Sequence, residues 1–181
     1  SRPRKLLTLV TKSNAQRHGM VMWDEIFEEI SQDYRDITTD KMLVDAMTTR
    51  MVLDPQSIDT VVASNLHADI LTDLAASLSG SMGIAPTGNL DPEKRHPSMF
   101  EPIHGSAFDI MGQGIANPIG SYWSAVMMLE NLGELKASQR LMSAIEKLTS
   151  DKKILPKDLG GKSSTKEVTK AMINIISGKN K

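Results

Sequence analysis

The sequence predicts an α/β layered fold, in which helices pack against a largely parallel sheet. In the first half of the 181 residues, short apolar runs alternate with longer segments whose apolar residues recur every three or four positions. Such alternation is typical of strands connected by helices. The second half begins with a segment rich in glycine and proline and then returns to helical spacing. A long loop of this kind usually serves binding.

The composition excludes several classes of function. The formal net charge is −1 and 40% of the residues are hydrophobic, so the chain has a core but no basic surface for nucleic acid. No apolar stretch approaches the length of a membrane span. The chain contains no cysteine, which excludes disulfides, zinc–thiolate sites and thiol catalysis. We therefore expect a cytoplasmic protein with neither a nucleic-acid nor a membrane partner.

The elements of the first half follow from their periodicity. Residues 6–10 predict a buried strand, and residues 20–34 an amphipathic helix. A second strand is expected near Ile37, and a helix over 42–53 that Asp54-Pro55 ends. The apolar residues of the first predicted helix are Trp23, Ile26, Phe27, Ile30 and Tyr34.

A strand over residues 59–64 leads into a helix that carries Asp69 and Asp73. Residues four apart lie on one face of a helix, so both carboxylates are within reach of one hard cation. We expect the apolar stripe of this helix to face the core and the aspartates to look into a cleft at its rim. Acidic residues that merely complement the helix dipole are the alternative. The stripe consists of Leu66, Ile70, Leu74 and Leu78.

Two further charged residues are candidates for chemistry. Lys12 follows the first strand, where open α/β sheets bind their ligands, and a lysine near a cation can accept a proton. Asp45 lies among apolar residues of the next predicted helix and is a possible third carboxylate for a metal. A solvated loop lysine and a partly exposed helix residue are the plainer alternatives.

The segment from Glu101 to Asn117 is the richest loop. Its glycines allow close approach of a ligand, and Ser106 and Ala107 leave space beside the ring of His104. Asp109 is placed to accept hydrogen bonds from vicinal hydroxyls. The segment lacks the G-x-G-x-x-G fingerprint, and a structural loop without a ligand stays open on spacing alone.

Helices return after this loop. Asn117-Pro118 predicts a helix start with proline at the first helical position, and the helix is expected to run to Gly133. A second helix is expected over 135–148. Ser164 and Glu167 have the spacing of a capping box for a last helix over 165–176, which Gly178 closes.

Four motifs together resemble the β-decarboxylating dehydrogenases, the family of isopropylmalate, isocitrate and tartrate dehydrogenases. They stand in the family's order and spacing over essentially the whole chain, which looks most like the tartrate and D-malate branch. The motifs are Thr11-Lys-Ser-Asn14, Val44-Asp-Ala46, Asn65-Leu-His-Ala-Asp69-Ile-Leu-Thr-Asp73-Leu-Ala and Glu101-Pro-Ile-His-Gly-Ser-Ala.

The resemblance implies a fold and roles. It implies an isopropylmalate-dehydrogenase-like layered fold, of which this chain is the C-terminal half. Asp45, Asp69 and Asp73 match the carboxylates that hold Mg²⁺ or Mn²⁺, and Lys12 matches the lysine that accepts or relays the proton of a 2-hydroxy dicarboxylic acid.

The resemblance also implies an NAD site. Asn14 matches a residue near the nicotinamide, and an aspartate at the position of Asp109 favours NAD over NADP. Residues matching the adenosine-binding segment are Glu101, His104, Gly105, Ser106, Ala107, Asp109 and Asn117.

Family members are homodimers, and the resemblance implies that Lys12 and Asp45 serve the partner's site. It assigns residues 1–80 to the small, dimer-forming domain and residues 81–181 to the large cofactor domain. A full-length member is about twice as long and carries substrate-binding arginines and a proton-donating tyrosine in its other half. The chain is thus expected to be a fragment of a dehydrogenase, or one half of a split enzyme that works with an N-terminal half chain. The alternative is a non-catalytic remnant that folds and oligomerises without turnover.

Overall fold

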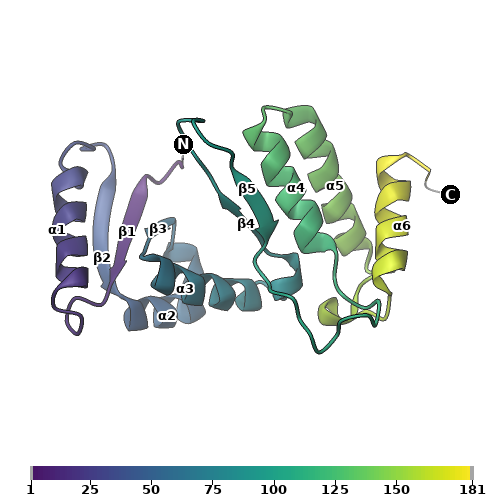
Figure 1. Cartoon of the computed structure of the whole chain (residues 1–181), viewed down its shortest axis with the longest axis horizontal. Helices are drawn as coiled ribbons and strands as arrows, with labels where there is room; N and C mark the ends of the chain where they lie inside the picture. Colours follow the sequence, from purple (N-terminus) through teal and green to yellow (C-terminus); the bar gives the residue numbers. More distant parts are fainter. Residues whose placement is uncertain (1, 180–181) are drawn as a thin grey trace. The chain divides into compact units, whose positions relative to one another are not determined.

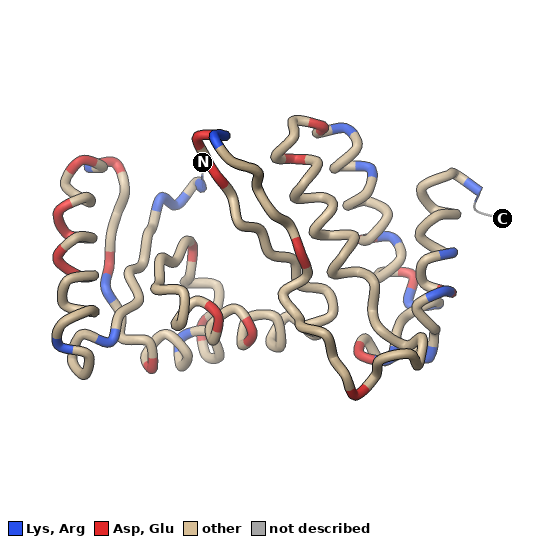
Figure 2. Tube along the Cα trace, in the orientation of Figure 1, with Lys and Arg blue, Asp and Glu red and all other residues tan. Residues whose placement is uncertain are grey.

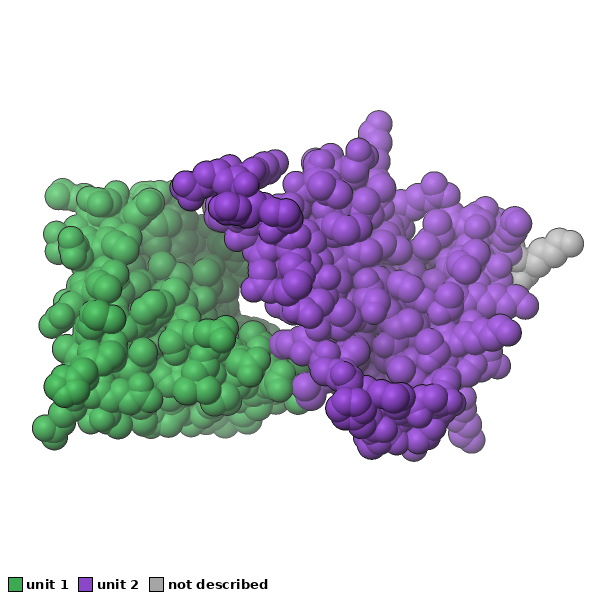
Figure 3. Space-filling view, in the orientation of Figure 1, with its two compact units in different colours: residues 1–78 green, residues 79–181 purple. Residues whose placement is uncertain are grey.

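A computed structural model describes residues 2–179 and divides the chain into two compact units, residues 1–78 and 79–181 (Figure 3). Each unit is a layered arrangement of helices and strands (Figure 1). Acidic and basic positions are interspersed along the traces of both units (Figure 2). Within residues 2–179, no helix combines the length and the apolar character needed to cross a membrane.

Unit 1 is built on a parallel sheet with the strand order β2-β1-β3. Leu7 pairs with Thr39 on one side and with Thr60 on the other, which fixes the register of all three strands. The elements are β1 (Leu6–Thr11), α1 (Gly19–Ser31), β2 (Thr38–Leu43), α2 (Val44–Leu53), the 3₁₀ turn η1 (Pro55–Ser57), β3 (Thr60–Val62) and α3 (Asn65–Leu78).

The register assigns the strand residues to two faces, because side chains alternate along a strand. One face carries Val10, Met42 and Val61, which pack with Met47 of α2 and Leu71 of α3 in the buried cluster of this unit. The opposite face carries Leu7, Leu9 and Val62, and α1 packs on it. The two faces are therefore covered by different helices.

Two details of unit 1 differ from the sequence prediction. The first helix ends at Ser31 rather than near Tyr34, because the chain turns there to enter β2 at Thr38. The predicted core stripe of α3 is wrong: Leu66, Ile70 and Leu78 are half-exposed, and the buried positions are His67, Leu71 and Ala76. Leu71 packs toward Met47 of α2, and this contact rotates the predicted stripe outward.

Unit 2 combines an antiparallel hairpin with three helices. Its elements are η2 (Met82–Ile84), β4 (Pro86–Asn89), β5 (Met99–Pro102), α4 (Ile119–Asn131), α5 (Leu135–Asp151), η3 (Lys157–Leu159) and α6 (Thr165–Ile176). The buried cluster joins the three helices and contains Ile119, Val126, Ala144, Ile145, Leu148, Val168 and Met172. The hairpin corrects the prediction of an unbroken loop: α4 packs on both of its strands, and this tertiary support offsets the weak strand propensity of glycine and proline.

The helix starts of unit 2 follow the sequence closely. α4 begins one residue later than predicted, at Ile119, and the Asn117 carboxamide oxygen accepts the amide of Ile119 at 2.9 Å. α5 extends three residues beyond its predicted end. The capping box is present: Ser164 accepts the amide of Glu167 at 3.3 Å, and Glu167 accepts the amide of Ser164 at 2.8 Å.

Candidate functional site

Lys12 and Asp45 form an ion pair at the carboxyl edge of the sheet. Lys12 directly follows β1. Asp45 lies in the first turn of α2, which begins immediately after β2, the parallel neighbour of β1. The Lys12 side chain is 28% exposed and that of Asp45 is 64% exposed. The hydrogen bond from Lys12 lowers the pKa of the Asp45 carboxyl, so the pair persists below the pH at which a free aspartate titrates.

A buried carboxylate supports the loop that carries Lys12. Asp24 of α1 lies against the end of β1, and its Oδ2 is 3.2 Å from the ammonium of Lys41 on β2. Burial acts to raise the pKa of Asp24, but hydrogen bonds from Thr11, Ser13 and Lys41 outweigh it and lower that pKa. Asp24 therefore places a charged carboxylate beside the two residues that flank Lys12.

Asp69 and Asp73 lie on α3, which follows the third strand at the same edge of the sheet. Asp69 is exposed and Asp73 half-buried. Within the described part of this single chain, no three acidic or histidine side chains are close enough to hold a metal ion. The helix thus supplies two carboxylates one turn apart. That fits part of a hard cation's ligand shell, which takes further oxygens from elsewhere.

The loop between β5 and α4 forms a pocket of about 1000 Å³ in unit 2. Its wall includes the half-buried ring of His104, and His104 Nδ1 lies 3.1 Å from the carbonyl oxygen of Gly105. Ser106, Ala107 and Asn117 also line it. Small residues, a ring and a carboxamide around such a volume fit an adenosine group.

Three predicted residues lie outside this pocket wall. Glu101 is exposed on β5 and pairs with Thr87 across the hairpin. Asp109 is exposed beside the pocket-lining Ile110, and its backbone carbonyl accepts Gln113 Nε2 at 2.8 Å. Asn14 lies in unit 1, in the exposed turn after Lys12.

Asp158 is a pocket residue that the sequence reasoning missed. Its Oδ2 accepts hydrogen bonds from Ser81 and, at 2.8 Å, from Asn117 Nδ2. A side chain at Gly83 would collide with this group, because an added Cβ would lie 2.6 Å from Asp158 Oδ2. The available signal was the polar turn Lys157-Asp-Leu-Gly-Gly161, which lies 40 residues beyond the predicted loop.

The start of α6 closes the pocket from another side. Thr165 donates its amide to the carbonyl of Gly114 at 2.9 Å and its hydroxyl to that of Ala116 at 2.5 Å. The turn before α6 requires a glycine at 161, since a Cβ there would lie 1.9 Å from the carbonyl oxygen of Leu155. The pocket loop itself holds Ala107 at a φ of 43°, a left-handed conformation that costs an alanine about 1 kcal/mol.

Comparison with known proteins agrees with this arrangement. The model of the isocitrate/isopropylmalate dehydrogenase family matches residues 1–175. The chain belongs to this family. The resemblance stated from the four motifs is thereby confirmed, as is the α/β fold.

Isocitrate/isopropylmalate dehydrogenase relatives are about twice as long as this chain. A probable tartrate dehydrogenase/decarboxylase, TtuC′ of Agrobacterium vitis, is 65% identical over 99% of this chain and 50% of its own length. The D-malate dehydrogenase [decarboxylating] of Escherichia coli (strain K12) is 44% identical over 97% of this chain and 50% of its own length. The chain thus spans about half the length of these relatives.

The solved structures of the family give the same result. The isocitrate dehydrogenase from Methylococcus capsulatus matches with a TM-score of 0.90 and 37% identity. The match covers 96% of this chain and 51% of that chain. The family fold is therefore retained over nearly all of the present sequence.

Proposed function

We propose that this chain supplies the metal- and adenosine-binding half of an NAD-dependent dehydrogenase that oxidatively decarboxylates a small 2-hydroxy dicarboxylic acid of the tartrate or D-malate type. The observation that carries the proposal is the grouping of Lys12 and Asp45, with the Asp69–Asp73 helix, at the carboxyl edge of one parallel sheet. Open α/β sheets bind their ligands at this edge. The names of the relatives supply the reaction class.

The metal site would be shared between two chains. Asp69 and Asp73 would hold Mg²⁺ or Mn²⁺ together with Asp45 of the partner subunit. When bound, the divalent ion would supply Lewis-acid polarisation of the substrate's hydroxyl oxygen. A shared site agrees with the absence of a three-ligand group among the described residues of one chain.

Lys12 would handle the proton of the substrate hydroxyl. In the free chain the ammonium group of Lys12 pairs with the carboxylate of Asp45. A nearby cation disfavours that charged form, so the assembled site would leave Lys12 able to accept a proton.

The pocket of unit 2 would bind the adenosine part of NAD. His104 and Asn117 would contact the base, and Gly105, Ser106 and Ala107 would allow the backbone to approach it. We propose that Asp109, in the same loop, turns toward the ribose hydroxyls and disfavours the 2′-phosphate of NADP by charge repulsion. Asn14 would lie near the nicotinamide.

The assembly would contain two copies of this chain and the N-terminal half of the fold. We propose that residues 1–80 form the dimer-forming part, that residues 81–181 form the cofactor part, and that the protein acts in the cytoplasm. Since the chain spans half the length of its relatives, we expect no turnover from the chain alone. The alternative, a remnant that oligomerises without catalysis, makes the same prediction for the isolated chain.

A complementation experiment distinguishes half of a dehydrogenase from a remnant without catalysis. The chain is co-expressed with the half of A. vitis TtuC′ that it does not match, and NADH formation is followed with D-malate, tartrate and Mn²⁺. We expect turnover that Lys12→Ala abolishes and that Lys136→Ala, an exposed lysine on α5, leaves intact. A complex without turnover for any of these substrates would favour the remnant.

The metal site has its own test. Mn²⁺ binding to the chain is measured by calorimetry, with Asp69→Ala/Asp73→Ala compared with Asp33→Ala, an exposed aspartate of the same unit. We expect the double variant to lose binding and the control to keep it. Binding that survived the double substitution would contradict the proposed ligands.

A further inference from the structure

Methionine is the only sulfur-containing residue of this chain, which has 12 methionines and no cysteine. Oxidants convert the methionine thioether into a sulfoxide, and a side chain that contacts water is open to this attack. Two exposed methionines, Met82 and Met111, line the pocket of unit 2. Oxidation of this protein can therefore act directly at the pocket for which we propose adenosine binding.

The pocket methionines differ from those of the core in their access to solvent. Met111 is 61% exposed and Met82 is 37% exposed. Met47 and Met172 belong to the buried clusters of units 1 and 2, and almost none of their surface meets solvent. A dissolved oxidant therefore reaches the two pocket methionines far more easily than it reaches those two core methionines.

Each pocket methionine stands on backbone that hydrogen bonds hold in place. Met82 begins η2, and the N-cap Ser81 just before it donates its hydroxyl to Asp158. Met111 follows Ile110, whose amide and carbonyl both take part in hydrogen bonds of the same turn. Two separate and ordered segments of unit 2 thus each bring a thioether residue to the pocket wall.

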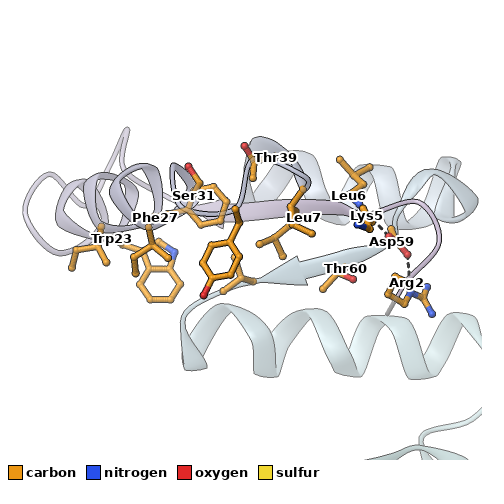
Figure 4. Close-up of a pocket in the computed structure, with 15 residues that line it drawn as sticks. Arg2, Lys5, Leu6, Leu7, Trp23, Phe27, Ser31, Thr39, Asp59 and Thr60 are labelled. Atoms are coloured by element: carbon orange, nitrogen blue, oxygen red, sulfur yellow. Dashed lines mark hydrogen bonds and ion pairs between the residues drawn. The ribbon is translucent and has the colours of Figure 1, made fainter. Parts of the chain in front are cut away.

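A second hollow, beside α1 in unit 1, provides a contrast within the same chain. Its volume is about 580 Å³, and aromatic and aliphatic side chains that include Trp23 and Phe27 line it (Figure 4). Among the described residues that line this hollow there is no methionine. Exposed thioethers therefore distinguish the unit 2 pocket from the other apolar hollow.

We propose that Met82 and Met111 form a reversible oxidation site that controls the affinity of the pocket for an adenosine group. The inference rests on the adenosine site proposed above and adds a regulation to it. In the thioether form, both side chains offer apolar and polarisable sulfur to the adenine ring. A sulfoxide is polar, and it loses hydrating water without gaining a hydrogen bond when the ring covers it. Oxidation therefore weakens binding.

The oxidation step transfers one oxygen atom from hydrogen peroxide to the thioether sulfur. A lone pair of the sulfur attacks a peroxide oxygen, so that a sulfur–oxygen bond forms and the oxygen–oxygen bond breaks. The transferred oxygen loses its proton and the leaving oxygen gains one, which gives a sulfoxide and one molecule of water. The sulfur is oxidised by two electrons and the peroxide is reduced by two. Methionine sulfoxide reductases reverse the change with electrons from a dithiol.

A footprinting experiment tests whether the ligand and the oxidant compete for the same side chains. The chain is treated with dilute hydrogen peroxide in the presence and absence of ADP-ribose, and peptide mass spectrometry measures the sulfoxide at each methionine. We expect ADP-ribose to protect Met82 and Met111, because it covers the pocket wall. Met22, which is 58% exposed on α1, should be oxidised equally in both samples.

The effect on affinity is measured by calorimetric titration with ADP-ribose. We expect the oxidised chain to bind it about tenfold or more weakly, because a polar group has entered an apolar contact. Treatment with the reductases MsrA and MsrB, which act on the two sulfoxide epimers, should restore the affinity. Circular dichroism and thermal unfolding of the oxidised chain check that it is still folded.

Matched leucine variants assign the effect to the pocket. Leucine is close to methionine in volume and has no sulfur to oxidise. For each variant, the affinity before oxidation is the reference for the affinity after it. Met82→Leu/Met111→Leu should lose less than about twofold on oxidation. Met22→Leu/Met99→Leu lacks two similarly exposed thioethers outside the pocket wall, and it should show the same loss as the wild type.

Three outcomes would overturn the oxidation site while leaving the adenosine site intact. One is an unchanged affinity after Met82 and Met111 have been oxidised. Another is an equal loss of affinity in Met82→Leu/Met111→Leu, which would place the damage elsewhere. The third is complete oxidation of Met22 while the two pocket methionines stay reduced. Failure of the unoxidised chain to bind ADP-ribose is a distinct result, which would reject the adenosine site and the oxidation site together.

Discussion

Unit 2 has a larger buried apolar cluster than unit 1, although both units also expose large apolar side chains. In unit 2 the fully or nearly fully buried side chains of α4, α5 and α6 form one cluster around Ile119 and Val168. In unit 1 the corresponding cluster contains only Val10, Met47 and Leu71. The difference teaches that three helices packed on one another bury a larger core in unit 2 than two helices on one face of a small sheet bury in unit 1.

The largest expected effect is the loss of a core side chain in unit 2. Ile119 is completely buried, so Ile119→Ala removes packed methylenes and leaves a cavity. We expect a loss of about 3 kcal/mol in the free energy of unfolding, measured by urea denaturation followed by circular dichroism. Ile173→Ala, on the exposed side of α6, is the control and should change it by less than about 1 kcal/mol. Equal effects would refute the contrast between core and surface.

The open faces of α3 should be an interface between copies of the chain. Ile70 is 54% exposed and Leu66 61% exposed, and Ile70→Glu would place a charge in that interface. We expect the dimer dissociation constant to rise about tenfold or more, which corresponds to about 1.4 kcal/mol. Light scattering over a concentration series measures it. A monomer at micromolar concentration before any substitution would contradict the expectation.

Asp24 should contribute more to the free energy of unfolding than an exposed acidic residue of the same unit. Asp24→Asn removes the charge that pairs with Lys41, whose ammonium lies 3.2 Å from Asp24 Oδ2, and we expect a loss of about 1.5 kcal/mol at pH 7. Because the folded-state pKa is lowered, this stabilisation is present above the unfolded pKa and is lost as the pH falls through the folded one. The difference between wild type and variant should therefore shrink below about pH 4. A difference that did not depend on pH would show that the carboxylate charge is not responsible.

The smallest predicted effect concerns a helix start in unit 2. Ser164→Ala removes the side-chain acceptor for the amide of Glu167 and should cost about 1 kcal/mol in urea denaturation. Ser150→Ala, in the exposed last turn of α5, serves as the control. Hydrogen bonds from Ser164 lower the pKa of Glu167, so the box should weaken as acid protonates that carboxylate. A cost that was unchanged at low pH would count against a contribution from Glu167.

The sequence predicted those elements whose structure depends on residues close together in the chain. The Ser164–Glu167 capping box and the helix over residues 165–176 match the structure to the residue, because both depend on neighbouring groups. The helix carrying Asp69 and Asp73 was also predicted. The ion pair of Lys12 and Asp45 was not predicted, because it depends on the parallel pairing of β1 and β2, which places both residues at one edge of the sheet.

Features set by distant partners could not be read in this way. The rotation of α3 depends on its contact with Met47 of α2, so spacing alone assigned the stripe of Leu66 and Ile70 to the core. The hairpin of β4 and β5 depends on its packing against α4, and its glycines and prolines led to the prediction of a loop instead. Asp24 carries a charge next to the apolar Trp23, and only the fold shows that it is buried beneath the Lys12 loop.

Gly161 shows how a position without any ligand contact can control a binding pocket. Its missing side chain lets the turn fold back on Leu155, and that turn delivers Thr165 to the carbonyls of Gly114 and Ala116. In a saturation mutagenesis screen, every replacement at 161 should therefore disturb the pocket wall and weaken the adenosine binding that we propose for it, although the residue is absent from that wall. Such a screen would group Gly161 with the residues that line the pocket. Only the backbone geometry would show that Gly161 acts by allowing the turn before α6 to form.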